Sequence, residues 1–346
     1  MQTRQQMFLD VIGAPDTRFV IPVYQRVYSW SKRQCDELWM DVCRAGRAKT
    51  THFVGTVLYA PETVSDTGVS RQLDIIDGQQ RTATLTLIMI ALAQYLRKRS
   101  LTLDAGIDAS FLEERYLYAG AGAHRSGKLQ LSRTDRATLQ AVLDGSELPQ
   151  EVSERVVDNF HLFCKKMESE DFDPQQLWDG MCQLLVIDAE LGGADQPQLI
   201  FESLNSKGVP LTTADLVRNY LLIASTHDDQ TRLYREYWEP IEGMFGDDPG
   251  SAKLNSAIRA WLSIRFPKVR IHDKSETYSV FKTYLEDEYD GTKEDLLDEM
   301  RSFCLMWAEN YKFHGVMDGA KNYRTADWAK GKRATLTPPR DTFGGF

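Results

Sequence analysis

Long apolar runs and a signal-peptide core are both missing from this sequence of 346 residues. The most apolar stretch, residues 83–96, is shorter than a membrane span and is interrupted by polar side chains. Residues 1–6 are polar, and no apolar segment typical of signal peptides follows them. The sequence therefore predicts a cytoplasmic protein without a membrane segment.

Cysteine is scarce as well. The sequence has five cysteines, an odd number, and none forms a Cys-x-x-Cys pair. This pattern excludes a disulfide framework and a cysteine-based zinc site, and it is typical of reduced thiols.

Positive charge is in deficit, with 41 Lys and Arg against 50 Asp and Glu and a net charge of −9. The acid is concentrated in residues 151–250, which carry 7 basic and 20 acidic side chains, whereas residues 1–50 carry 8 and 5. A nucleic-acid partner is therefore expected to meet the N-terminal region or the basic residues near the C-terminus.

Short β-branched segments alternate with amphipathic ones in the first part of the chain. Residues 52–59 and 69–77 read as a hairpin, and residues 183–190 as a further strand. Thr3 and Gln6 have the spacing of a capping box and predict a short first helix. We expect an α+β fold whose small mixed sheet is followed by a mainly α-helical region. The predicted domains are residues 1–225, a helical region at 226–320, and a basic tail or linker to a missing domain at 321–346.

One stretch stands out at the end of a predicted buried strand. Residues 77–81 read Asp-Gly-Gln-Gln-Arg and lead into an apolar helix. A strand, a tight turn and a helix leave main-chain N–H groups pointing at an anion, and Gly78 and Arg81 suit a phosphate there. The alternative is an ordinary Asp-Gly turn in which Arg81 only pairs with a carboxylate.

Residues 24–30 form a second unusual stretch, Tyr-Gln-Arg-Val-Tyr-Ser-Trp, just before a helix capped by Ser31 and Gln34. Arginine and aromatic side chains together suit the stacking of bases or the clamping of a planar ligand. The alternative is that Tyr28 and Trp30 cap the core and Arg26 is solvated.

A third polar loop lies between two predicted helices at residues 205–210. Asn205, Lys207 and Gly208 either face the phosphate site or belong to a simple turn. Thr212 and Asp215, three residues later, have the spacing of a capping box and predict the start of the next helix.

Together the three stretches resemble the N-terminal domain family of the GmrSD type IV restriction endonucleases. The resemblance rests on three blocks in matching order, residues 21–30, 77–85 and 201–219, and it spans roughly residues 5–225. It implies a ParB/sulfiredoxin-like core that binds and hydrolyses a nucleoside triphosphate with Mg²⁺. It also implies a role in bacterial antiviral defence through a restriction system that recognises modified DNA, and in some relatives phosphorothioate DNA.

The resemblance and the residue types suggest a role for each matching position. Asp77 would hold the metal or the attacking water, Gln79 or Gln80 would orient that water, and Arg81 would hold the phosphates. The expected catalytic residues are Asp77, Gln79, Gln80 and Arg81; the expected nucleotide-binding residues are Gly78, Thr82, Arg26, Asn205, Lys207 and Gly208; and the expected DNA-binding residues are Tyr24, Gln25, Arg26, Tyr28 and Trp30.

One feature of many relatives is missing. Their second domain carries an HNH-type histidine motif, and neither His272 nor His314 stands in such a motif. We therefore expect no DNA cleavage by that chemistry from this chain, and a nuclease that is a separate chain or was removed. The competing interpretation is a DNA-binding or protein-interaction module without turnover, in which the same turn binds a DNA phosphate.

Overall fold

A computed structural model describes residues 1–62, 71–192, 195, 200, 211–223, 227–246, 252–273 and 276–314. They divide into two units: residues 1–210 with 222–231, and residues 211–221 with those from 232 onward. The first unit combines a mixed sheet with helices and the second is helical, so the expected α+β class is confirmed. Among the described helices, none is long and apolar enough to cross a membrane.

The first unit is built on a six-stranded sheet with the order β1-β8-β3-β4-β2-β7. The expected hairpin is confirmed, because β3 and β4 pair antiparallel, while β2 runs parallel to both β4 and β7. The strands are β1 (Gln2–Met7), β2 (Thr17–Val20), β3 (His52–Glu62), β4 (Arg71–Asp77), β7 (Leu129–Gln130) and β8 (Leu184–Glu190), with a separate pair of β5 (Tyr118–Ala119) and β6 (Ser126–Gly127).

The N-terminal helix predicted from Thr3 and Gln6 is wrong in its first half. Residues Gln2–Met7 form β1, which pairs antiparallel with β8 along its whole length, and α1 starts only at Phe8. Pairing with a distant strand satisfies the backbone groups of this segment, which a local capping pattern cannot foresee.

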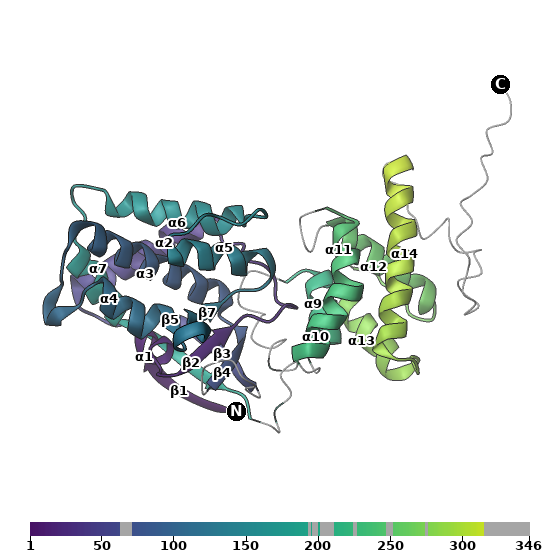
Figure 1. Cartoon of the computed structure of the whole chain (residues 1–346). Coiled ribbons are helices and arrows are strands. Elements are labelled where there is room, and N and C mark those ends of the chain that lie inside the picture. Colours follow the sequence, from purple (N-terminus) through teal and green to yellow (C-terminus); the bar gives the residue numbers. More distant parts are fainter. Residues whose placement is uncertain are drawn as a thin grey trace. The chain divides into compact units, whose positions relative to one another are not determined.

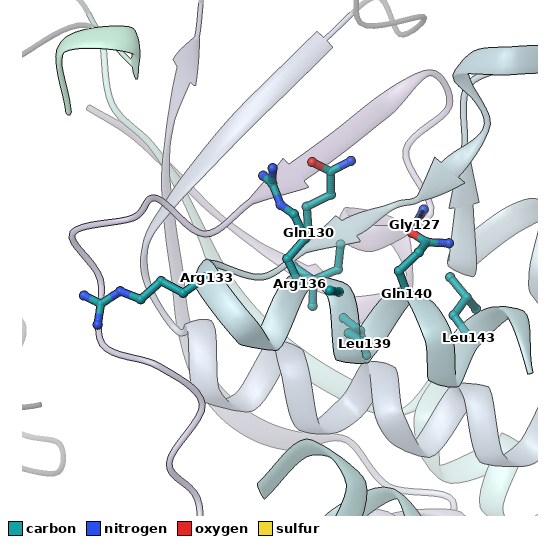
Figure 2. A pocket seen from close by; sticks show the side chains of 9 residues that line it. Gly127, Gln130, Arg133, Arg136, Leu139, Gln140 and Leu143 are labelled. Carbon is teal, nitrogen blue, oxygen red and sulfur yellow. Dashed lines mark hydrogen bonds between the residues drawn. The ribbon is translucent and has the colours of Figure 1, made fainter. Parts of the chain in front are cut away.

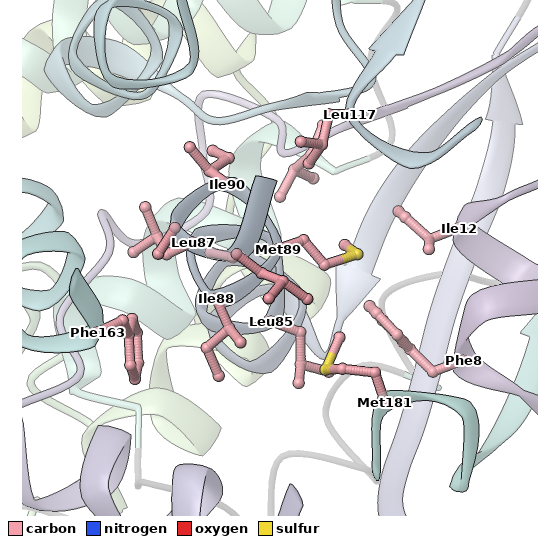
Figure 3. Close-up of a cluster of buried hydrophobic side chains, with 14 of the residues drawn as sticks. Phe8, Ile12, Leu85, Leu87, Ile88, Met89, Ile90, Leu117, Phe163 and Met181 are labelled. Carbon is pink, nitrogen blue, oxygen red and sulfur yellow. The ribbon is translucent and has the colours of Figure 1, made fainter. Parts of the chain in front are cut away.

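Helix α3 is the centre of the first unit. Its leucine, isoleucine and methionine side chains radiate in every direction, and Figure 3 shows them meeting Phe8, Phe163 and Met181 from other helices. A helix that is apolar all round must be enclosed, and Figure 1 shows the helices gathered beside it on one face of the sheet. The helices of this part of the chain are α1 (Phe8–Ile12), α2 (Lys32–Ala48), α3 (Gln79–Arg99), α4 (Ala109–Leu112), α5 (Arg133–Asp144), α6 (Glu154–Met167) and α7 (Pro174–Cys182), with short helical segments η1 (Asp104–Gly106), η2 (Glu113–Leu117) and η3 (Gly122–His124).

The second unit is organised by a buried arginine. Arg218 is fully buried and donates to Asp215 at 2.7 Å and to Glu242 at 2.5 Å, and Glu242 also accepts from Tyr234 and Trp238. Asp215 bonds Thr212 as well, so the predicted cap is confirmed. The remaining elements are α9 (Thr213–Leu222), α10 (His227–Leu233), η5 (Tyr234–Trp238), α11 (Glu239–Gly243), α12 (Ala252–Arg265), α13 (Thr277–Asp287) and α14 (Lys293–His314).

The sheet face opposite α3 carries a buried acid. Leu73 and Ile75 of β4 point into the core, so Asp74 between them points the other way. Asp74 is 5% exposed, and its Oδ1 accepts no hydrogen bond in the described structure. Burial raises the pKa of Asp74 to about 7, Glu62 adds to the rise, and Arg136 opposes it.

This shift makes stability depend on pH. Because the folded-state pKa lies above the ordinary value of 3.8, the folded chain keeps a proton that the unfolded chain releases between about pH 4 and 7. The free energy of unfolding is therefore highest at the acid end of this window and falls as the pH rises through it.

We predict that Asp74→Asn removes this slope. Between pH 5 and 7 the free energy of unfolding of the wild type should fall by about 2 kcal/mol relative to the variant, as measured by urea denaturation. Asp158→Asn, which changes an exposed acid of α6, is the control and should keep the wild-type slope. Parallel pH profiles for Asp74→Asn and the wild type would contradict the prediction.

Candidate functional site

The turn between β4 and α3 is built on a glycine that no other residue can replace without strain. Gly78 has φ +91° and is the N-cap of α3. A Cβ at this position would lie 2.7 Å from the carbonyl oxygen of Thr56 on β3. Gly78 therefore lets β4 pass straight into α3 and brings the first helical turn against β3.

Arg81 lies in that first turn and rests on β3. Its Nη2 donates to the carbonyl oxygen of Thr56 at 2.8 Å. Gly55 has φ +106°, and a Cβ there would meet the guanidinium at 2.7 to 3.0 Å, so this glycine makes the space that Arg81 occupies. The bonded partner of Arg81 is thus a main-chain carbonyl and not a carboxylate.

Asp77 and Arg81 influence each other across the turn. Burial lowers the pKa of the Arg81 guanidinium, while the negative charge of Asp77 acts in the opposite direction. Both side chains are partly exposed. Thr82 is buried and its hydroxyl donates to the carbonyl oxygen of Gly78 at 3.0 Å, so it ties the turn together.

The side chains of the two glutamines of the motif form hydrogen bonds to other residues of the chain. Gln80 donates to the carbonyl oxygen of Val27 at 3.1 Å and accepts from the main-chain N–H of Ser29 at 2.8 Å. Gln79 donates to Gln25 at 3.3 Å, and Gln25 in turn donates to the carbonyl oxygen of Ile76. The amides of α3 thereby hold the loop of residues 22–30, which we call the clasp loop.

Part of the clasp loop is buried. Tyr24, Gln25 and Tyr28 are each 3% exposed or less, and the Tyr28 hydroxyl lies 2.7 Å from the hydroxyl of Thr84. For Tyr28 this is the packing role that the sequence left open as an alternative. Arg26 and Trp30 are partly exposed, so they are the two predicted DNA-binding side chains that reach the surface.

Sequence reasoning missed the second support of the clasp loop, which comes from α5. Arg133 donates through Nε and Nη2 to the carbonyl oxygen of Val23 at 3.2 and 3.1 Å, and Asp135 accepts from the N–H of Tyr28 at 2.6 Å. These contacts join residues more than 100 positions apart, so no local pattern announces them. Gly55 and Thr56 were missed as well, because they meet Arg81 from a different element, the strand β3.

The structure brings the predicted residues of the first two blocks together, since the turn and the clasp loop are bonded to each other. A void of about 10 Å³ lies between them, lined by Arg26, Gln79 and Gln80 among others, and holds no more than a water molecule. Asn205, Lys207 and Gly208 lie outside the described residues.

We predict that Gln80→Ala loosens the clasp loop. The change removes the partner of two main-chain groups and should lower the free energy of unfolding by about 1 to 3 kcal/mol. Amide hydrogen exchange at Ser29 should become faster, and urea denaturation measures the stability. Gln150→Ala, at an exposed position, should match the wild type in both measurements. A Gln80→Ala protein with wild-type exchange at Ser29 would show that this bond does not hold the loop.

A search of curated proteins finds no match. The family model of the GmrSD restriction endonuclease N-terminal domain matches residues 8–222, which is more than half of the chain and includes the turn and the clasp loop. A domain of this kind works in a restriction system, which implies an interaction with DNA. The chain therefore belongs to the family of GmrSD restriction endonuclease N-terminal domains.

Proposed function

We propose that this chain is a nucleoside-triphosphate-hydrolysing sensor of a restriction system that recognises modified DNA. The observation that carries the proposal is the position of Arg81. Its guanidinium is partly desolvated at the N-terminus of α3, is held by a carbonyl, and feels the negative charge of Asp77. A cation fixed beside the first-turn N–H groups of a helix, which have no acceptor within the helix, is the arrangement that binds phosphate.

The main chain supplies further donors for the phosphates. The first-turn N–H groups of an α-helix have no acceptor inside the helix, and the helix dipole adds partial positive charge at this end. In α3 these groups follow Gly78 directly. Because Gln79 and Gln80 are tied to the clasp loop, their main-chain groups are better placed than their side chains to contact a nucleotide. If Gln79 or Gln80 oriented the attacking water, the side chain of that glutamine would first have to release its bond to the clasp loop.

Asp77 suits a metal that arrives with the nucleotide. No cluster of three or more acidic, histidine or cysteine side chains that suits a metal ion occurs in the described part of the chain. Mg²⁺ commonly binds through one or two carboxylates together with substrate phosphates, so one partly exposed carboxylate fits it. When bound, Mg²⁺ would offset the negative charge of the phosphates. Asp77 would hold it, and Arg81 would stabilise the charge that develops on the transferred group.

Contact with DNA is proposed for the exposed part of the clasp loop. Arg26 and Trp30 are the partly exposed cation and aromatic side chain of this loop, and Arg26 lines the small void beside Gln79 and Gln80. Arg26 would add a second positive charge near the phosphates, and Asn205, Lys207 and Gly208 would close the site. A change at the clasp loop would reach the turn through Gln79 and Gln80, which supports a sensor of phosphorothioate or other modified DNA.

The test is nucleotide turnover by purified variants. Arg81→Ala should reduce phosphate release about a hundredfold, with and without modified DNA, because removal of one charge-stabilising donor has effects of this size. Gly55→Ala keeps the arginine but displaces its guanidinium, and it should reduce turnover as well. Arg33→Ala, at an exposed arginine of α2, is the control and should hydrolyse like the wild type.

Turnover by Arg81→Ala at the wild-type rate would rule out this site. If the wild type releases no phosphate from any of four nucleoside triphosphates but binds DNA with a steep salt dependence, the chain is a DNA-binding module without turnover. Thermal melting of each variant separates loss of activity from loss of folding.

A further inference from the structure

A cavity of about 330 Å³ lies at the β7 edge of the sheet, between β6, β7 and the outer side of α5 (Figure 2). None of its lining residues belongs to the turn or to the clasp loop. Its volume lies in the range of cavities that bind small molecules. We call it the α5 cavity.

The floor of the α5 cavity is apolar. Leu129, Leu139 and Leu143 are buried side chains that line it, and Ala137 lines it from an exposed position of α5. Gly127 lets β6 approach α5 closely, because a Cβ there would lie 3.2 Å from Gln140 Oε1 and 3.4 Å from Leu143. The cavity thus offers a flat apolar group a place to pack.

The rim of the α5 cavity carries one arginine, Arg136, on the side where Gln130 lies. Two arginines and no acid occur among its lining residues, in a chain whose net charge is −9. Arg133 is turned onto the carbonyl oxygen of Val23, and Figure 2 shows its side chain pointing away from the others. Arg136 is exposed, and its Nε donates to the carbonyl oxygen of Leu131 at 3.1 Å.

A second polar group stands beside Arg136. Figure 2 shows the amide of Gln130 and the guanidinium of Arg136 on the same side of the cavity. Gln130 Nε2 donates to Ser126 Oγ at 3.1 Å, which holds the amide in place. Two acids lie near the rim. Asp144 accepts hydrogen bonds from Tyr118 and Gln140, and the carboxyl group of Asp74, on the sheet face opposite α3, interacts electrostatically with Arg136.

From these features we propose that the α5 cavity binds a nucleotide. The base would pack on the leucines, its edge would meet the amide of Gln130, and the phosphate would meet Arg136. Glutamine amides pair with base edges, and guanidinium groups pair with phosphate oxygens. The ligand is either a free nucleotide or a nucleotide within a DNA strand, since both present the same base and phosphate. This site is independent of the nucleotide hydrolysis proposed at Arg81.

Calorimetric titration of the full chain with four 5′-nucleoside monophosphates tests the proposal. The Arg81→Ala background removes binding at the turn, so saturable binding in that background belongs elsewhere. Ala137→Phe fills the cavity from an exposed helical position, and Arg136→Gln removes the charge. Each should weaken binding at least about tenfold. Ala48→Phe adds the same ring at an exposed alanine of α2 and should leave binding unchanged.

Two further ligands distinguish the sources and the chemistry. Binding of a 12-nucleotide single strand that Ala137→Phe abolishes, without binding of monophosphates, supports the site and assigns it to DNA. Inorganic phosphate should bind much more weakly than the monophosphates. The proposal is overturned if neither monophosphates nor the oligonucleotide bind, if Ala137→Phe leaves their affinity unchanged, or if inorganic phosphate binds equally well.

Discussion

The enclosure of α3 is the constraint on which the first unit depends. This helix is apolar on all sides, so it gains stability only when the sheet and the surrounding helices cover it completely. Each buried leucine or isoleucine of such a core typically contributes about 2 to 5 kcal/mol against truncation to alanine. Gly78 joins β4 to α3 without a linker, so packing of the helix also determines where its N-terminus lies. The position of Arg81 on Gly55 is a consequence of core packing.

Hydrogen bonds connect the enclosed helix α3 to the clasp loop, which is partly exposed. The amides of Gln79 and Gln80 hold the loop from α3, and Arg133 and Asp135 hold it from α5. A buried polar group that loses its partner costs free energy through desolvation, so the bonds made by these four side chains favour one loop conformation. Arg133 also lines the α5 cavity. One helix therefore touches both the loop and the cavity.

The third block of the family pattern has a structural role where the structure describes it. Arg218 is buried between Asp215 and Glu242, and the hydroxyl of Tyr234 and the indole of Trp238 satisfy Glu242 further. A buried charge is tolerated only when it is paired and hydrogen-bonded. The sequence predicted the cap formed by Asp215, but the partner Glu242 lies 24 positions after Arg218 and follows no local spacing.

The sequence by itself determined the family of the chain, from three separate blocks, and local patterns determined the hairpin of β3 and β4, the capped start of α2 and the buried helix after Gly78. The last three follow from patterns that neighbouring residues complete by themselves. Tertiary structure alone decided that residues 2–7 pair as a strand, that Gln79, Gln80 and Tyr28 face the protein interior, and that Arg81 rests on Gly55. It also placed Gln130 and Arg136 at one cavity. In each of these cases the partner is distant in the sequence, so the outcome depends on which surfaces folding brings together.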